Sequence, residues 1–204
     1  MSPRPYRSDR RTAAAEETRR RVLAAAREHL SGPAVTRVSV DAVAKAADVS
    51  RQTVYNAFGS KSGLLEALFD SLAEHAGLSL EAAFTADDAD TAFAEFCKAF
   101  CSFWASERPV VRRLRGMAVL DDDLDELLRA RDEMRKAGLT SLFTRFEGEE
   151  PSPDVLDVAW QLTSFESYDL LAGRDGDAAR STEDVARIVA GAVVSVRKGL
   201  STGA

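Results

Sequence analysis

Side chains suited to recognising a nucleic acid are concentrated in one short segment near the amino terminus. Five of the six residues in RQTVYN, at 51–56, carry groups that donate or accept hydrogen bonds: Arg51, Gln52, Thr53, Tyr55 and Asn56. Guanidinium, amide and hydroxyl groups on one helix can contact base edges and phosphates in the major groove of duplex DNA. Val54 and Phe58 lie at helical spacing, and we expect them to face inward. The segment therefore predicts a helix face that reads DNA.

The preceding residues predict the helix and turn that position this segment. Ser39 is expected to cap a helix over 40–47, because its hydroxyl can accept a backbone N–H of the first turn, and Asp41 suits the positive end of that helix. The helix ends at Asp48. A tight turn there needs one residue with positive φ, and Asp tolerates that conformation better than most residues. Ser50 is then expected to cap the second helix.

Contacts with the DNA backbone are expected on either side of these helices. Arg37 lies in the link before the first helix. Lys61 lies at the start of the third, where the N-terminal N–H groups already favour a phosphate. The full candidate set for DNA contact is Arg37, Ser39, Ser50, Arg51, Gln52, Thr53, Tyr55, Asn56 and Lys61. Similar helix pairs also occur in bundles that bind no DNA, where such groups are only solvated.

The segment resembles the DNA-binding region of the TetR/AcrR family of bacterial repressors. The matching letters are V-D-A-V-A-K-A-A-x-V-S at 40–50, T-V-Y-x-x-F at 53–58 and S-K-x-x-L at 60–64. Asp48 departs from the family, which usually has glycine at this position. The resemblance implies a ligand-responsive repressor that binds a pseudo-palindromic, double-stranded DNA operator as a homodimer.

Charge is divided unequally along the chain. The net charge is −6, but residues 1–61 hold 12 Arg and Lys against 6 Asp and Glu, whereas residues 62–204 hold 15 against 27. A basic head on an acidic body suits a protein that binds nucleic acid at one end. No stretch reaches the roughly 18 consecutive apolar residues of a membrane span, and the basic amino terminus lacks an apolar signal-peptide core. We therefore expect a cytoplasmic protein with no membrane partner.

Helical periodicity, caps and breakers, without strand alternation, predict an all-α fold of about nine helices. An N-terminal three-helix helix-turn-helix head would precede a C-terminal helical bundle. We expect a disordered basic arm over 1–11, a DNA-binding domain over 12–60, and a ligand-binding and dimerisation domain over 61–204. Pro109 is expected to open a helix of its own, because proline suits the first helical turn.

The last two predicted helices, over 153–171 and 181–198, carry apolar groups on more than one face. Such helices must be covered on more than one side, either by the rest of the chain or by a second copy. The resemblance implies a second copy and a four-helix dimer interface. The residues assigned to this interface are Leu162, Phe165, Val185, Ile188, Val189, Ala192, Val193 and Val196.

Aromatic side chains are frequent between the head and these two helices, with polar residues among them. Apolar walls with a few directed polar groups are typical of small-molecule pockets, although an aromatic ring taken alone is more often a plain core residue. The resemblance implies a pocket for a small hydrophobic or amphipathic effector. The candidate lining residues are Phe100, Trp104, Met117, Phe143, Trp160, Phe165 and Tyr168.

No catalytic, cofactor or metal-binding set is predicted, so we do not expect an enzyme. The GxSxG, P-loop, GxGxxG and HExxH motifs are missing, and His29 and His75 are isolated. Cys97 and Cys101 share one helix face. A redox function for this pair of cysteines is left open as an alternative, although packing as small core residues explains them better. The alternative functions are a helical protein-interaction module without DNA binding and a DNA-binding regulator with no small-molecule ligand.

Overall fold

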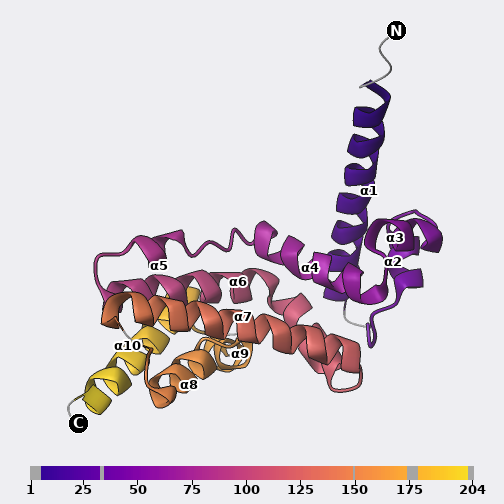
Figure 1. The fold of residues 1–204 in the computed structure, drawn as a ribbon. Coiled ribbons are helices and arrows are strands. Elements are labelled where there is room, and N and C mark those ends of the chain that lie inside the picture. Colours follow the sequence, from indigo (N-terminus) through magenta and orange to yellow (C-terminus); the bar gives the residue numbers. More distant parts are fainter. Residues whose placement is uncertain (1–5, 33–34, 149, 174–178, 202–204) are drawn as a thin grey trace. The chain divides into compact units, whose positions relative to one another are not determined.

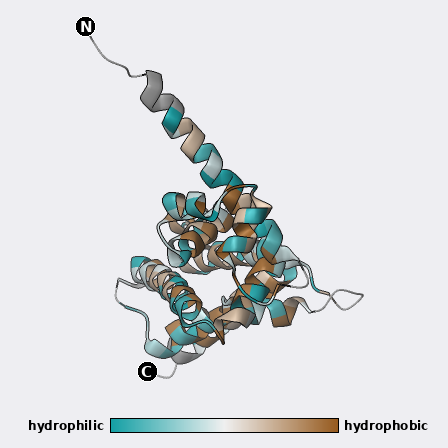
Figure 2. Ribbon diagram, turned by 90° about the vertical axis from the view of Figure 1, so that its right-hand side faces the viewer, coloured by the Kyte–Doolittle hydropathy of each residue, from teal (hydrophilic) through white to brown (hydrophobic). Residues whose placement is uncertain are grey.

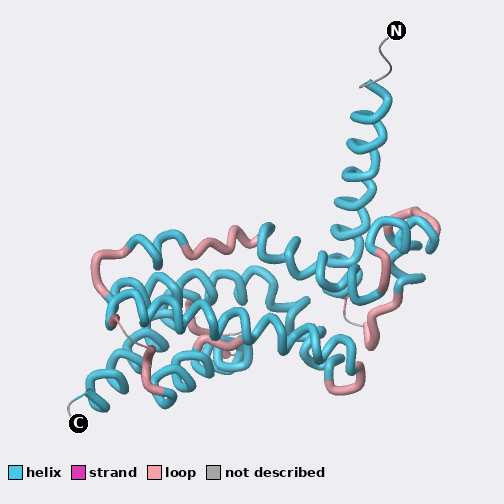
Figure 3. The backbone as a smooth tube through the Cα atoms, in the orientation of Figure 1, coloured by secondary structure: helices cyan, strands magenta, loops and turns pink. Residues whose placement is uncertain are grey.

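The computed structural model describes residues 6–32, 35–148, 150–173 and 179–201. Within these ranges helix is the only regular secondary structure, as Figure 3 shows, which confirms the all-α prediction. No helix in these ranges is long and apolar enough to cross a membrane. The helices are α1 Tyr6–Ser31, α2 Val40–Ala46, α3 Arg51–Phe58, α4 Lys61–His75, α5 Glu81–Thr85, α6 Ala89–Ala118, α7 Asp122–Glu147, α8 Pro153–Leu162, α9 Phe165–Ala172 and α10 Thr182–Ser201.

These helices, labelled in Figure 1, pack into two compact units. The head comprises the described residues up to Leu72 together with Arg112–Leu127. The body comprises Ala73–Val111 together with the described residues from Leu128 onward. The boundary predicted after residue 60 falls inside the head, because most of α4 belongs to it. The end of α6 and the start of α7 also belong to the head, which the linear sequence did not indicate.

The head is built around apolar side chains at helical spacing on its first four helices. The apolar stripe of α1 is buried in full: Val22, Leu23, Ala26 and Leu30. α1 contacts α2, where Ala44 is buried beside Val43 and its small side chain permits close helix packing. Val54 of α3 and Leu65 of α4 are buried as well. The core of the head therefore follows from the helical pattern of the sequence.

α1 begins at Tyr6, so the disordered arm predicted over 1–11 is wrong for residues 6–11, and residues 1–5 lie outside the described part of the chain. Residues 11–17 are all exposed, and Figure 2 shows no continuous hydrophobic stripe on these outer turns. Alanine, arginine and glutamate are among the best helix formers. Extending a packed helix is also easier than nucleating a new one. Helix propensity therefore carries α1 beyond its buried stripe.

α6 continues through Pro109, so the prediction that this proline opens a separate helix is wrong. Proline inside a helix removes one backbone hydrogen bond and clashes with the preceding turn, which costs about 3 kcal/mol. Phe103 and Trp104 before the proline, and Val110 and Val111 after it, are all buried. Burying such side chains stabilises by about 1.5–3 kcal/mol each. Packing on both sides of the proline therefore outweighs the local penalty.

Aromatic rings from α6, α7 and α9 form much of the core of the body. Phe93 stacks on Phe143 with ring centroids 5.5 Å apart, and Trp104 meets Phe165 edge to face at 5.7 Å. The indole N–H of Trp104 donates to the backbone carbonyl of Thr163 at 3.0 Å. The polar end of this buried ring is thereby satisfied, as burial of tryptophan requires.

The single helix predicted over 153–171 is divided into α8 and α9. Thr163 ends α8, and its hydroxyl donates to the carbonyl of Ala159 at 2.8 Å. Ser164 caps α9 by accepting the backbone N–H of Ser167 at 3.2 Å. Ser and Thr form local bonds of this kind in competition with the helix ladder, which is why a Thr-Ser pair can end one helix and begin the next.

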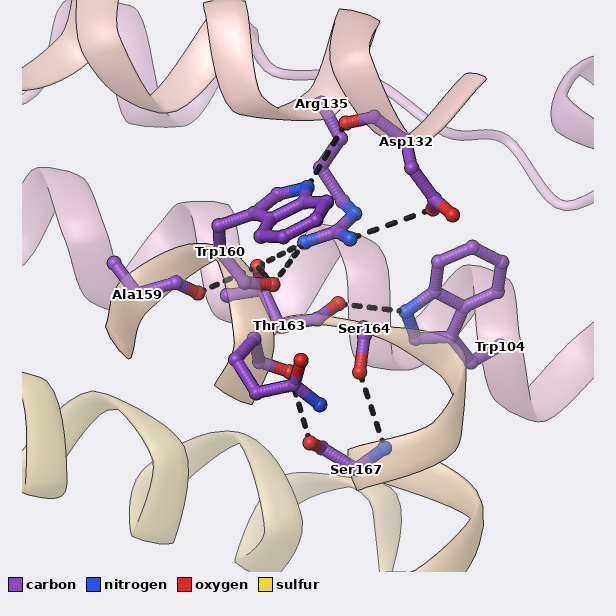
Figure 4. Close-up of polar contacts among 9 residues, drawn as sticks. Trp104, Asp132, Arg135, Ala159, Trp160, Thr163, Ser164 and Ser167 are labelled. Carbon is purple, nitrogen blue, oxygen red and sulfur yellow. Dashed lines mark hydrogen bonds and ion pairs between the residues drawn. The ribbon is translucent and has the colours of Figure 1, made fainter. Parts of the chain in front are cut away.

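A buried arginine holds the break between α8 and α9, as Figure 4 shows. Arg135 of α7, 5% exposed, donates to the Thr163 hydroxyl at 2.6 Å and to the backbone carbonyl of Trp160. Asp132 lies 3.4 Å from the same guanidinium, and its carbonyl accepts the indole N–H of Trp160 at 3.1 Å. The arginine thus satisfies polar groups that the interruption of the helix would leave buried.

The two cysteines are core residues of the body. Both are free and buried on α6. Burial raises the pKa of the Cys101 thiol to about 12 and raises the pKa of Cys97 well above its ordinary value. Because the thiolate is the reactive form, these thiols are poor candidates for a redox pair. Among the described residues, no group of three or more His, Cys, Asp or Glu side chains could hold a metal ion.

Candidate nucleic-acid interface

The helix predicted after Ser50 is confirmed as α3, and its polar residues lie at the surface of the head. Ser50 caps α3 by accepting the backbone N–H of Thr53 at 3.0 Å. Val54 and Phe58 are buried and anchor the inner face. The remaining predicted contact residues of α3 are exposed or partly exposed: Arg51, Gln52, Thr53, Tyr55 and Asn56.

The turn between α2 and α3 has the bonds of a Schellman motif. Asp48 has a φ of 52° and is the one non-glycine residue with positive φ in the ranges described above. Its N–H donates to the carbonyl of Lys45 at 3.2 Å, and the N–H of Val49 donates to the carbonyl of Ala44 at 3.0 Å. These bonds satisfy carbonyls at the end of α2. The positive φ predicted for Asp48 is therefore confirmed.

Replacing Asp48 with glycine is expected to stabilise the protein by up to about 1 kcal/mol, because glycine adopts positive φ without the steric penalty of a Cβ. Urea-induced unfolding followed by circular dichroism measures the difference. Asp48→Asn is the control, since it removes the charge and keeps a side chain that tolerates this conformation. A glycine variant that unfolds more readily than the wild type would contradict this interpretation of the turn.

The exposed side chains of α3 are ordered by one another and by α2. Arg51 donates to the two carboxylate oxygens of Asp41 at 3.1 and 3.3 Å and to the Tyr55 hydroxyl at 3.2 Å. Tyr55, and then Asp41, raise the pKa of the Arg51 guanidinium. Gln52 donates its amide N–H to the side-chain oxygen of Asn56 at 2.9 Å. The exposed side chains of α3 are therefore held in place by contacts within the head.

Arg19 of α1 supports α3 and was not found from the sequence. Its guanidinium donates to the carbonyl of Ala57 at 2.9 Å and lies 4.5 Å from the centroid of the Phe58 ring. The C-terminal carbonyls of a helix carry partial negative charge, so a cation is favourable there. Nothing in the local sequence pairs two residues this far apart, and only the packing of α1 against α3 brings them together.

Arg37, Ser39 and Lys61 lie outside α3. Arg37 is exposed in the link before α2, and Ser39 caps α2 by accepting the backbone N–H of Ala42 at 3.3 Å. Lys61 is the first residue of α4 and forms an ion pair with Asp121, within the head. The hydrogen bond from Lys61 lowers the pKa of Asp121. The residue predicted to bind phosphate therefore already has a carboxylate partner.

The predicted pocket residues are divided between the two units. Five are buried in the body: Phe100, Trp104, Phe143, Phe165 and Tyr168. Trp160 is half-buried, with Lys136 Nζ 4.8 Å from its ring centroid. Met117 belongs to the head. The buried rings pack partly on one another, for example Phe100 on Trp104 at 5.9 Å. Their role in binding an effector stays a prediction.

The predicted dimer residues divide into two groups. Four are buried within this chain: Phe165, Val185, Val189 and Val193. Four reach the surface at least in part: Leu162, Ile188, Ala192 and Val196. The buried valines form the face of α10 that packs within the body, where α10 contacts α8 and α9. Leu170 of α9, which was not predicted, is 81% exposed.

Comparisons with known proteins agree with this arrangement. Residues 22–68 match the family model described as bacterial regulatory proteins, tetR family. No curated protein matches the sequence. A TetR-family transcriptional regulator from Rhodococcus sp. is 23% identical, with 89% of this chain and 99% of that chain covered and a TM-score of 0.68. GusR from Salmonella enterica is 24% identical, with 90% and 95% covered and a TM-score of 0.62.

The all-α fold and the capped, outward-facing α3 give the head a helix-turn-helix whose second helix lies at the surface. The matched family model covers residues 22–68, and the fold over most of the chain is similar to that of solved TetR-family regulators. The matched residues extend from the buried stripe of α1 into α4, so they cover both helices of the helix-turn-helix and the turn that joins them.

Proposed function

We propose that the protein is a ligand-responsive repressor that binds a pseudo-palindromic operator as a homodimer. The exposed face of α3 is the observation that carries this proposal. Its cap and buried anchors fix the helix, while Gln52 and Asn56 point polar groups away from the core. A dimer can place two such helices in successive major grooves if they lie about 34–36 Å apart. Because its target is the bacterial chromosome, we place it in the cytoplasm.

Binding to duplex DNA and its salt dependence test the DNA-binding half of this proposal. Labelled duplexes recovered from a random pool by the protein serve as probes for fluorescence anisotropy. Affinity should fall steeply between roughly 50 and 200 mM salt, because Arg and Lys release counterions from the phosphates they contact. The helical interaction module considered as an alternative would leave the anisotropy unchanged at low salt, and that result would overturn the proposal.

Exposed apolar side chains on α9 and α10 support dimerisation through these helices. Leu170 is 81% exposed and Ile188 is 38% exposed, and the exposed Ala192 lies one helical turn beyond Ile188. Large apolar side chains that stay exposed in a single chain often mark an interaction surface. We therefore assign the interface to the outer face that carries the exposed Leu170, Ile188 and Ala192, and not to the valines that the body buries.

Replacing Ile188 with glutamate is expected to convert the dimer into a monomer, because a charge in the centre of an apolar interface is left without water or a partner. Sedimentation velocity measures the mass of the species in solution. Leu120→Glu is the matched control, since Leu120 is exposed in the head, outside this face. Equal sedimentation of the Ile188 variant and the wild type would contradict the assignment.

The regulatory half of the proposal is a shift between two conformational populations of the protein, which differ in the arrangement of the body. An effector that binds one arrangement of the body more tightly than another changes DNA affinity by the ratio of those two affinities and by no more. Both tryptophans of the chain, Trp104 and Trp160, lie in the body, so their fluorescence can report effector binding there. If compounds that quench this fluorescence never change operator affinity, binding in the body does not regulate DNA binding and the proposed population shift is wrong.

A further inference from the structure

We propose that Asp121 competes with a DNA phosphate for Lys61, so that the turn between α6 and α7 lowers the affinity of the head for DNA until this ion pair opens. The inference rests on the proposed function, because it assigns a regulatory contact to a lysine predicted to bind DNA. It concerns two residues of the head, separated by 60 positions in the sequence.

Lys61 lies where a phosphate approaching α3 would meet it. Only Gly59 and Ser60 separate α3 from α4, so the lysine directly follows the helix that presents the polar face. Ser60 accepts the backbone N–H of Gly63 at 2.9 Å and fixes the first turn of α4. The N–H groups of a first helical turn and an ammonium group both attract an anion. A free Lys61 would therefore add one phosphate contact to the interface.

Asp121 supplies an anion to the same ammonium group within the chain. Its carboxylate pairs with Lys61 and also accepts the backbone N–H of Leu124 at 3.3 Å, which caps α7. The side chains of Lys61 and Asp121 are 29% and 24% exposed, so the pair is partly shielded from water and salt. Partly buried pairs are screened less than surface pairs. A phosphate must therefore displace a carboxylate that is already held in place.

The segment carrying Asp121 is anchored in the head and continues into the body. Arg113 of α6 donates to the carbonyls of Leu30 and Ser31 at the end of α1, at 3.1 and 2.8 Å. Leu114 and Leu124 are buried on either side of the turn. Both α6 and α7 extend from the head into the body without interruption. A change in the body that shifts the start of α7 would thus alter how tightly Lys61 is held.

Asp121→Asn tests the proposal, because asparagine caps a helix as well as aspartate does and removes only the charge that holds Lys61. The probes are a random-sequence duplex and the duplex selected by the wild type. We expect roughly 3- to 10-fold tighter binding to both, about the effect of one added phosphate contact. Asp123→Asn is the matched control, since Asp123 is an exposed carboxylate in the first turn of the same helix.

A double-mutant cycle separates the ion pair from general charge effects. In a Lys61→Gln background, Asp121→Asn should change affinity no more than Asp123→Asn does. The proposal is overturned if the gain persists without Lys61, or if the Asp121 and Asp123 variants behave alike in the wild-type background. Asp121→Ser, which also keeps a capping oxygen, replaces the asparagine variant should that variant unfold. If the wild type binds neither duplex, the proposed function itself fails.

Discussion

Arg135→Ala should lower the free energy of unfolding by about 3 kcal/mol, because it leaves buried polar groups unsatisfied and opens a cavity. The guanidinium bonds the Thr163 hydroxyl and the Trp160 carbonyl at the break between α8 and α9. It also lies 5.9 Å from the Trp160 ring centroid, so packing is lost as well. Urea-induced unfolding measures the loss.

Two further variants identify the cause of this loss. Arg135→Met keeps much of the volume, so whatever stability it loses is due mainly to the missing hydrogen bonds. Arg187→Ala removes an arginine that is 72% exposed and pairs with Asp184 one turn away. Such surface pairs contribute little, so this control should stay within about 0.5 kcal/mol of the wild type. Equal losses for the Arg135→Ala and Arg187→Ala variants would show that Arg135 does not hold the break.

Gln52→Ala should relax base preference by roughly 10- to 100-fold at one position in each half-site, since a side chain that reads a base edge contributes about 1–3 kcal/mol of discrimination. Gln52 is exposed on α3, and its amide is held by Asn56 at 2.9 Å. Affinities for the selected duplex and for its single-base variants measure the change. The second exposed glutamine, Gln161, lies in the body, and Gln161→Ala should alter neither affinity nor preference.

A different pattern is expected for a residue that contacts only the backbone. Lys61→Ala should weaken binding to all duplexes alike and reduce the salt dependence, because a phosphate contact carries no base information. If Gln52→Ala weakened every duplex equally while Lys61→Ala changed base preference, the roles assigned to these two residues would be reversed.

Local patterns in the sequence predicted the head well. The caps at Ser39 and Ser50, the buried Val54 and Phe58, and the positive φ of Asp48 each depend on residues within one or two turns. Such features follow from capping, periodicity and turn chemistry, which act over a few residues. The all-α class and the position of the helix-turn-helix could therefore be predicted directly from the sequence.

The features that sequence reasoning missed depend on contacts between distant segments. Pro109 stays inside α6 because side chains on both sides of it are buried, and local rules cannot weigh that burial. The break at Thr163 is completed by Arg135, which is 28 residues away. The partner of Lys61 is likewise remote in the sequence. The Thr163-Ser164 pair was the one local signal from which the break between α8 and α9 could have been predicted.

The predicted dimer stripe on α10 shows the same limit. Val185, Val189 and Val193 share a helix face with the spacing expected of an apolar interface. Periodicity reveals that a face will be covered and does not reveal whether the same chain or a second copy covers it. The structure buries these three within the chain, and leaves Ile188 exposed beside them on the same helix.

Selection of duplexes from a random pool by the purified protein, followed by sequencing of the bound fraction, tests the central claim most directly. If α3 of each subunit reads a major groove, the enriched sequences should contain two inverted half-sites whose centres lie about 10–10.5 base pairs, or a multiple of that, apart. The Gln52→Ala variant should select duplexes with a weaker base preference at one position in each half-site. A pool that stays random after repeated rounds at low salt would contradict the account.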